Sequence, residues 1–189
     1  MNTKAEIRQK YKLLRKSFSE NEIDRLSLSL AKVITDNFQL KNNKISVFLS
    51  IKELNEINTQ FIINELKNQN SIYVTKSNFS NCEMVHIPFT EKTIININEF
   101  GIPEPLDDSE TINPIELDVV FVPLLAFNKD GHRIGYGKGF YDRFLSKCSS
   151  NCKFIGVSLF ENTEEYSEIS SSDIKLNYCI TPTKCIHFE

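Results

Sequence analysis

The spacing of hydrophobic residues changes from a helical to a strand-like period about 40 residues into the chain. Before that point, apolar residues recur every three or four positions, which predicts two amphipathic helices over residues 3–18 and Glu20–Phe38. Ser19 and Glu22 form a capping-box pattern at the start of the second helix. The expected apolar stripe of the first helix is Ile7, Tyr11, Leu14 and Phe18. Charged residues are spread around the rest of that helix, namely Lys4, Arg8, Lys12, Arg15 and Lys16.

Further along the chain, short β-branched and aromatic runs alternate with helical segments. Helices are predicted over Thr59–Asn68 and residues 139–148. The predicted strands are Ile45–Leu49, Ile72–Thr75, Met84–Ile87, Leu117–Phe127, Phe154–Leu159 and Tyr178–Thr181. The run Leu117–Phe127 is the most apolar, as expected of a strand that is covered on both faces. The alternation predicts an α/β fold, a three-layer sandwich with a largely parallel central sheet flanked by helices.

Composition narrows the class of protein. The 189 residues contain no internal repeat, low-complexity tract or linker rich in proline, glycine or serine, so we expect a single domain over residues 1–189. The net charge is −3 and there is no Lys/Arg block, which argues against nucleic acid as a partner. No apolar run is long enough to span a bilayer, and the charged first residues do not form a signal peptide. We therefore expect a cytoplasmic protein without membrane contact.

The five cysteines support that location. They are odd in number and include no Cys-x-x-Cys pair. Cys148 and Cys152 lie four positions apart, a spacing that on a helix would allow a metal clip between them. Reduced thiols, some of them filling the core, are the favoured interpretation.

Candidate chemistry gathers in a glycine-rich loop that follows the most apolar strand. Four of the chain's six glycines fall within Gly131–Gly139. Alternating glycines allow backbone N–H groups to converge on one anion, and a following helix adds its own free N–H groups. Arg133 and Lys138 bring cations to the same place. The loop predicts a polyphosphate site; a turn that merely reverses the chain is the alternative, and the spacing matches neither the dinucleotide-binding nor the P-loop motif.

Asp142 comes directly after this loop. A carboxylate there would repel phosphate unless a Mg²⁺ ion joined the two. Magnesium takes one or two carboxylates together with phosphate oxygens. Asp142 is therefore a candidate metal ligand, and the alternative is an acidic residue that simply favours a helix N-terminus.

The stretch Val122–Leu145, which contains Gly-His-Arg-Ile-Gly-Tyr-Gly-Lys-Gly-Phe-Tyr-Asp, resembles the signature of the 5-formyltetrahydrofolate cyclo-ligase family, also called methenyltetrahydrofolate synthetases. The likeness extends over most of the chain. Lys4-x-x-x-Arg8 resembles the family's ATP-contacting pair, and Glu56–Thr59 and Gly101–Pro105 resemble two further family segments. From the residues alone, the Lys4 and Arg8 pair is a solvated helix face and Glu56 is an exposed acid before a helix.

The resemblance implies an enzyme that converts 5-formyltetrahydrofolate and ATP, with Mg²⁺, to 5,10-methenyltetrahydrofolate, ADP and phosphate. Phosphorylation of the formamide oxygen would give an iminium phosphate, on which nitrogen-10 closes the ring. Lys138 and Arg133 would be catalytic, because they stabilise the transferring phosphoryl group. A monomer or a weak homodimer is expected.

The resemblance also assigns binding residues. The implied ATP contacts are Lys4, Arg8, Arg133, Ile134, Gly135, Tyr136, Gly137, Lys138, Gly139, Phe140 and Tyr141. The implied folate contacts are Leu49, Glu56, Pro103, Glu104, Tyr136, Gly137, Lys138, Gly139 and Phe140. Asp142 and Asp173 would bind Mg²⁺. Around Asp173 the proline usual in the family is missing, and the alternative role of this aspartate is to cap a helix or turn.

Two other functions remain open from the sequence. Similar α/β folds serve phosphosugar isomerases and CoA transferases, but the glycine-flanked segment offers neither a Lys/Glu pair nor a glutamate nucleophile. The second is a folate- or nucleotide-binding module without turnover. The presence of Lys138 and Asp142 argues against such a module.

Overall fold

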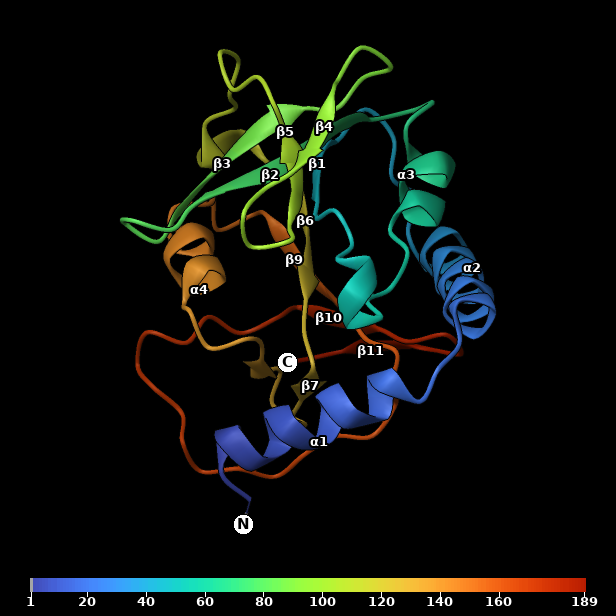
Figure 1. Cartoon of the computed structure of the whole chain (residues 1–189), viewed down its shortest axis with the longest axis vertical. Helices are drawn as coiled ribbons and strands as arrows, with labels where there is room; N and C mark the ends of the chain where they lie inside the picture. The colour runs from blue at the N-terminus through green and yellow to red at the C-terminus, as the bar shows by residue number, and fades with distance from the viewer. Residues whose placement is uncertain (1) are drawn as a thin grey trace.

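A computed structural model describes residues 2–189 and contains one central sheet of seven strands. These strands are β1 (Lys44–Val47), β2 (Ser71–Asn78), β3 (Glu83–Pro88), β6 (Val119–Pro123), β9 (Lys153–Val157), β10 (Tyr178–Ile180) and β11 (Cys185–His187). Their order is β11-β10-β9-β6-β1-β2-β3 (Figure 1). The inner strands are parallel, and β3 and β11 run antiparallel to their neighbours at the two edges. The predicted α/β fold with a largely parallel sheet is confirmed.

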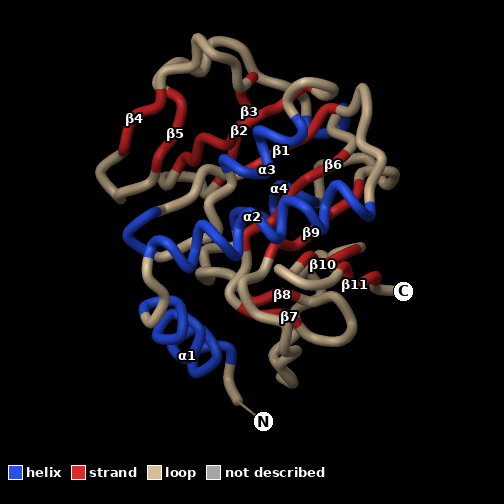
Figure 2. The backbone as a smooth tube through the Cα atoms, turned by 90° about the vertical axis from the view of Figure 1, so that its right-hand side faces the viewer, coloured by secondary structure: helices blue, strands red, loops and turns tan. Residues whose placement is uncertain are grey.

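Helices cover both faces of this sheet and one of its ends. They are α1 (Lys4–Lys16), α2 (Glu20–Asn37), α3 (Gln60–Leu66) and α4 (Phe140–Leu145), with short 3-10 helices η1 (Lys52–Leu54) and η2 (Pro114–Glu116). Figure 2 shows α2 and α3 lying over the sheet, with α1 set apart below them. As predicted, α2 begins with a capping box of Ser19 and Glu22. Within the described residues, no helix has both the length and the apolar character needed to cross a bilayer.

Strand β6 divides the hydrophobic core into two halves. Val119 and Phe121 belong to the cluster under α2 and α3, whereas Val120 and Val122 belong to the cluster under α4. Successive side chains of a strand point to opposite faces, so the two clusters lie on opposite sides of the sheet. All four side chains are buried. The expectation that this strand is covered on both faces is confirmed.

The predicted strand Leu117–Phe127 is too long and corresponds to two elements. β6 ends at Pro123, and β7 (Ala126–Phe127) pairs instead with β8 (Arg133–Ile134) in a separate antiparallel hairpin. The apolar run continues past Pro123 because Leu125, Ala126 and Ile134 form a third buried cluster against α1. The run is apolar throughout because its first part belongs to the sheet and its second part packs against α1.

The buried stripe of α1 also differs from the expected one. Its buried residues are Ile7, Tyr11 and Arg15, whereas Leu14 is 40% exposed. Arg15 takes the place of an apolar residue because its guanidinium group finds hydrogen-bond acceptors inside the molecule. The helix is thus rotated slightly from the orientation that its apolar residues alone predict.

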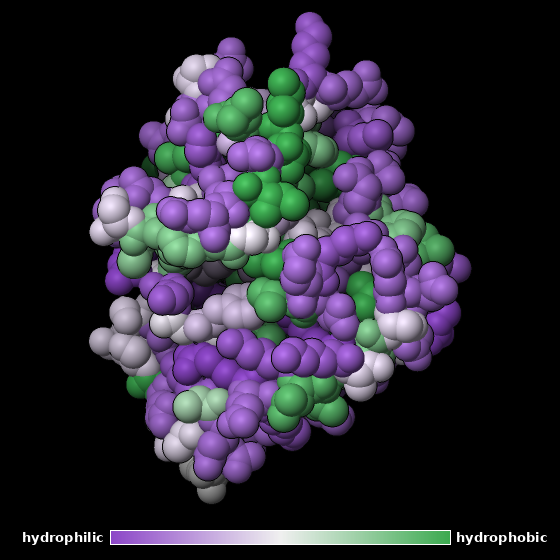
Figure 3. Space-filling model, in the orientation of Figure 1, coloured by the Kyte–Doolittle hydropathy of each residue, from purple (hydrophilic) through white to green (hydrophobic). Residues whose placement is uncertain are grey.

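A second small hairpin, β4 (Ile95–Ile97) with β5 (Pro103–Pro105), crosses the sheet beside β2. The sequence does not predict it, because strands of three residues carry no measurable period and β5 begins and ends with proline. Its apolar side chains are unusually exposed, with Ile97 at 63% and Phe100 at 56%. In Figure 3 hydrophobic side chains gather over this hairpin.

Candidate functional site

A cavity of about 530 Å³ lies at the carboxyl ends of β1, β2 and β6. Leu49 follows β1, Ser77 lies near the end of β2, and Pro123 ends β6; all three line the cavity. After β1 the chain adds β2 on one side and β6 on the other, so the strand order reverses there. Ligands of open α/β sheets bind at such a reversal.

The glycine-rich loop forms one wall of this cavity. Residues Gly135–Asp142 line it together with Arg133. Gly137 has φ of +88°, and a side chain there would come within 3.1 Å of the Arg8 guanidinium carbon. Arg8 in turn donates from Nε to the Gly135 carbonyl oxygen at 2.9 Å. The loop thus lies close against Arg8 of α1, and its positive φ at Gly137 favours glycine there.

Ile134 is the exception among the predicted loop contacts. Its side chain is 1% exposed and packs in the cluster beneath α1 with Ile7 and Tyr11. It does not line the cavity, so its side chain supports the loop from behind.

Cations and carboxylates face the cavity in pairs. The Lys4 ammonium lies 2.7 Å from Asp173 Oδ2, and the Arg133 guanidinium lies 2.7 Å from Asp142 Oδ1. Asp142 also accepts a hydrogen bond from the backbone N–H of Ile174, at 3.1 Å. Ile174 directly follows Asp173, so this bond connects Asp142 to the segment that carries Asp173. Both predicted metal ligands thus line the same cavity, and each forms an ion pair with a predicted ATP contact.

The carboxylates of this cavity fit a Mg²⁺ ion that is bound together with phosphate. Asp142 and Asp173 both line the cavity. Among residues 2–189 there is no group of three or more His, Cys, Asp or Glu side chains that could hold a metal ion. Two carboxylates completed by phosphate oxygens and water are what Mg²⁺ requires, so the residues fit an ion that arrives with a nucleotide. Cys148 and Cys152, whose spacing allowed a metal clip, are free thiols outside the cavity.

Glu56 also lines the cavity and is buried, unlike the exposed acid that the sequence alone indicated. Its Oε1 accepts a hydrogen bond from the Tyr136 hydroxyl at 2.5 Å, and its Oε2 accepts one from the Ile51 N–H at 2.8 Å. Burial, reinforced by the Glu56 carboxylate, raises the pKa of Tyr136 well above its usual value. The Tyr136 hydroxyl therefore remains a proton donor at neutral pH and joins the glycine loop to the Glu56 wall.

Aromatic rings form a third wall, part of which the sequence did not reveal. The rings of Phe79 and Phe100 lie 4.1 Å apart, and those of Phe79 and Phe140 lie 5.1 Å apart. All three line the cavity. Phe100 directly precedes the family-like segment Gly101–Pro105, a hint that could have identified it, whereas nothing in the sequence around Phe79 marks it.

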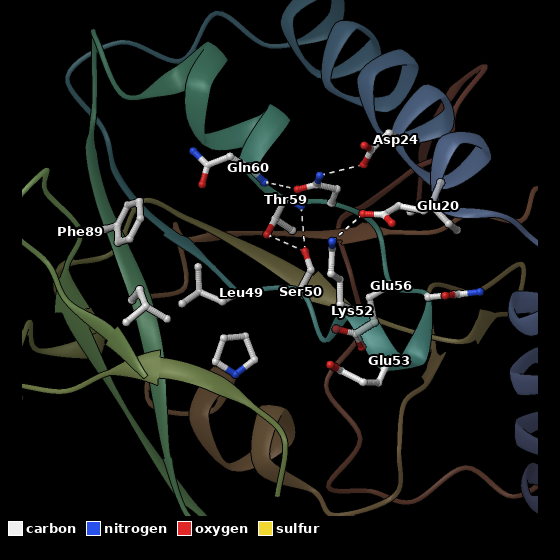
Figure 4. Close-up of a pocket in the computed structure, with 15 residues that line it drawn as sticks. Glu20, Asp24, Leu49, Ser50, Lys52, Glu53, Glu56, Thr59, Gln60 and Phe89 are labelled. Atoms are coloured by element: carbon white, nitrogen blue, oxygen red, sulfur yellow. Dashed lines mark hydrogen bonds and ion pairs between the residues drawn. The ribbon is translucent and has the colours of Figure 1, made fainter. Parts of the chain in front are cut away.

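Pro103 and Glu104 lie outside the main cavity. Pro103 lines a neighbouring cavity of about 570 Å³, which adjoins the main one at Leu49 and Glu56. Figure 4 shows this second cavity, where Lys52 points toward Glu20 of α2. Glu104 lines a third cavity of about 510 Å³ on the far side of the Phe79 and Phe100 rings. Of the predicted folate contacts outside the glycine loop, Leu49 and Glu56 are thus the two that line the main cavity.

Comparison with known proteins gives a consistent result. The model of the 5-formyltetrahydrofolate cyclo-ligase family matches residues 1–182. The 5-formyltetrahydrofolate cyclo-ligase of Mus musculus is 32% identical over 154 residues, which are 77% of this chain and 72% of the relative. That of Haemophilus influenzae is 33% identical over 156 residues, 81% of this chain and 79% of the relative. The NMR structure of Aquifex aeolicus 5,10-methenyltetrahydrofolate synthetase shares the fold, with a TM-score of 0.76, 24% identity, and coverage of 98% of this chain and 93% of that one.

Proposed function

The chain belongs to the 5-formyltetrahydrofolate cyclo-ligase family, and from that premise we propose how its cavity performs the reaction. The enzyme is a 5-formyltetrahydrofolate cyclo-ligase. In our proposal it consumes ATP with Mg²⁺, forms 5,10-methenyltetrahydrofolate and releases ADP and phosphate. One observation carries the proposal: a single cavity holds cations, a pair of carboxylates and an aromatic wall, the groups that a nucleotide and a folate require together.

The first step activates the formyl oxygen, which is a poor leaving group. That oxygen attacks the γ-phosphorus of ATP; the new O–P bond forms as the bond to the bridging oxygen breaks, and ADP leaves. Catalysis of such a transfer is mainly positioning and charge neutralisation. Backbone N–H groups of Gly135–Gly139, with Arg8 and Arg133, would hold the phosphates. Within residues 2–189 the Lys138 ammonium makes no ion pair, which leaves it available for the transferring phosphoryl group.

Asp142 and Asp173 would hold Mg²⁺ as it arrives with the nucleotide. When bound, this ion neutralises phosphate charge and orients the γ-phosphate. For this to happen, Lys4 and Arg133 must leave their carboxylate partners, and the phosphates offer them new ones. The ion pairs of the structure therefore keep the charges of the site balanced until the nucleotide replaces them.

The second step closes the ring. Nitrogen-10 attacks the carbon of the iminium phosphate; the C–O bond then breaks, and phosphate departs with its electron pair and takes up the proton that nitrogen-10 loses. Leu49, Tyr136 and Phe140 would enclose the folate and exclude bulk water. Glu56, an acceptor of two protein hydrogen bonds, has further lone pairs free for N–H donors of the pterin.

The direct test is an activity measurement on the purified protein. With 5-formyltetrahydrofolate and MgATP we expect the absorbance of the methenyl product to rise, with one ADP formed per product molecule. Replacing Mg²⁺ with EDTA should abolish the rise. A protein that forms neither methenyl product nor ADP would refute the proposal.

Lys138→Ala tests the assignment of the catalytic cation. Loss of a charge that acts in the transition state should lower kcat by about 100- to 1000-fold. The KM for folate should change only a few-fold, because the substitution removes little ground-state binding. Lys147→Ala is the matched control, since Lys147 is an exposed lysine paired with Glu83 outside the cavity. Equal rates for the two variants would contradict the assignment.

A further inference from the structure

We propose that Arg15 is a positioning residue of this active site, a role that rests on the proposed function. Arg15 does not line the cavity. It contacts two residues that do, Tyr136 in the glycine loop and Glu56 in the segment that follows η1. In this role it fixes the position of the folate-binding wall relative to the phosphate-binding loop.

The contacts of Arg15 are those of a fixed group. The side chain is buried, and it donates from Nη1 to the Tyr136 hydroxyl at 3.0 Å and from Nη2 to the Leu124 carbonyl at 2.5 Å. Nη1 also lies 3.7 Å from Glu56 Oε1. A buried guanidinium group is tolerated only when it is paired, and its planar fork fixes the directions of its partners. The orientation of Tyr136 and Glu56 is thus set by one cation behind them.

The backbone of Arg15 is fixed as well. Asn55, which directly precedes Glu56, donates from Nδ2 to the carbonyl oxygens of Arg15 and Phe18, each at 2.9 Å. Asn55 adopts a left-handed conformation with φ of +47°, which asparagine tolerates better than most residues. The end of α1 is therefore joined to the Glu56 segment twice, once through the Arg15 side chain and once through its backbone.

The other basic residues of the site act differently. Lys4, Arg8, Arg133 and Lys138 line the cavity, where they can meet phosphate. Arg15 is bound to the phenol and the carboxylate instead, and none of its hydrogen bonds reaches those four side chains. Its loss should therefore disturb folate binding and ring closure more than binding of the nucleotide.

Arg15→Lys and Arg15→Met provide the test. The KM for 5-formyltetrahydrofolate should rise about tenfold or more, the consequence of losing a hydrogen bond to a charged group, and kcat should fall. The KM for MgATP should stay within about twofold. A lysine keeps the charge but cannot reach Tyr136 and Leu124 at once, so its effect should be the smaller of the two. Lys16→Met, an exposed neighbour on the same helix, is the matched control.

Arg15→Met removes the cation next to the buried Glu56 carboxylate. This can unfold the protein, so a second variant is needed. Tyr136→Phe removes the hydroxyl that bonds both Arg15 and Glu56 and keeps the ring. If Arg15 acts through this hydroxyl, the double variant Tyr136→Phe with Arg15→Lys will change the free energy derived from the folate KM by less than the sum of the two single variants. Thermal unfolding of each variant checks that the fold is intact.

The outcomes separate the two proposals. If the unsubstituted protein forms no methenyl product, the proposed function fails and the role of Arg15 fails with it. If that protein is active, three results would each overturn the role of Arg15 alone. These are an unchanged folate KM and kcat in folded Arg15→Lys, an equal rise in the KM for MgATP, and additive effects in the double variant.

Discussion

His86 illustrates how burial decides the behaviour of a single ionisable residue. It lies on β3, is 1% exposed, and stacks on Phe144 with ring centroids 3.9 Å apart. Neither ring nitrogen has a hydrogen-bond partner among the described residues. Burial lowers the pKa of His86 to about 3. The folded protein therefore keeps this ring neutral at any pH where the enzyme would work.

We predict that His86 makes the fold sensitive to mild acid. Its folded pKa is lower than that of an unfolded histidine, so the unfolded chain takes up a proton first as the pH falls. The stability is complete above about pH 6.5 and should drop by about 2 kcal/mol between pH 7 and pH 5 on account of this residue. Denaturant unfolding of the protein and of His86→Phe at both pH values measures this difference.

Exposed His187 is the control for that experiment. His187→Gln should keep the pH dependence that His86→Phe loses. If His86→Phe and the unsubstituted protein lose the same stability between pH 7 and pH 5, the buried ring is not the cause.

Single residues also mark the limit of what the sequence could predict about the site. Arg15 and Lys16 are adjacent basic residues of one helix, yet the first is buried and the second exposed. The partners that make a buried arginine tolerable, Tyr136 and Glu56, come from distant parts of the chain. A local pattern could not reveal them. The glycine loop carries its own chemistry within a few positions, so its place in a cavity wall could be predicted, whereas its polyphosphate role stays a prediction.

At the scale of elements, the glycine loop and α1 form one unit. Arg8 binds the carbonyl oxygen of Gly135 and lies against Gly137, so the helix fixes the shape of the loop. Gly101, in the β4–β5 hairpin, also has a positive φ, of +77°, but a side chain added there would meet open space. Both glycines therefore have a positive φ, but only Gly137 lies against another side chain.

Gly137→Ala and Gly101→Ala separate those two effects. Each should lower the free energy of unfolding by about 1–2 kcal/mol, because alanine is strained in the left-handed region. Only Gly137→Ala should displace Arg8, and we expect it to raise the KM for MgATP about tenfold. Steady-state kinetics with chemical denaturation measures both quantities. An equal rise in that KM for Gly101→Ala would show that backbone strain, and not Arg8, is responsible.

The elements differ in how well the sequence predicted them. The two N-terminal helices were predicted to within a residue or two, because several turns of a regular apolar period define them. β7 and β8 have two residues each, too few to show a period, and the apolar run 117–127 merged β7 with β6. The helices and strands that the sequence did not predict have only two or three residues each.

At the scale of the whole molecule, the site depends on contacts between distant parts of the chain. Lys4 and Asp173 are 169 positions apart, and Arg8 reaches 127 positions forward to Gly135. Lys4 also binds Glu168 through its backbone N–H, at 3.1 Å. The first helix and the segment before β10 thus meet at the end of the cavity where we propose that the nucleotide binds.

This arrangement predicts that ATP and Mg²⁺ bind cooperatively. Metal-free ATP would have to break the Lys4–Asp173 and Arg133–Asp142 pairs and leave two carboxylates facing its phosphates, whereas MgATP gives every charge a new partner. We expect the Kd for MgATP to be at least about tenfold lower than that for ATP in EDTA, a difference of about 1.4 kcal/mol. Isothermal titration calorimetry measures both.

Asparagine substitutions show whether the carboxylates are the cause. Asp142→Asn and Asp173→Asn should each tighten binding of metal-free ATP and reduce the advantage of MgATP. Asp36→Asn, on the exposed face of α2, should change neither. If the unsubstituted protein binds both forms of ATP equally well, the paired charges do not couple the two ligands.

The Lys4–Asp173 contact has a consequence for how long the protein survives in a cell. Proteases cut a folded protein where a segment opens locally. Here α1 and the segment around Asp173 are joined at the site that MgATP would occupy, so a bound nucleotide would hold both against opening. A well-supplied cell would therefore retain the enzyme, and depletion of ATP would expose it to degradation.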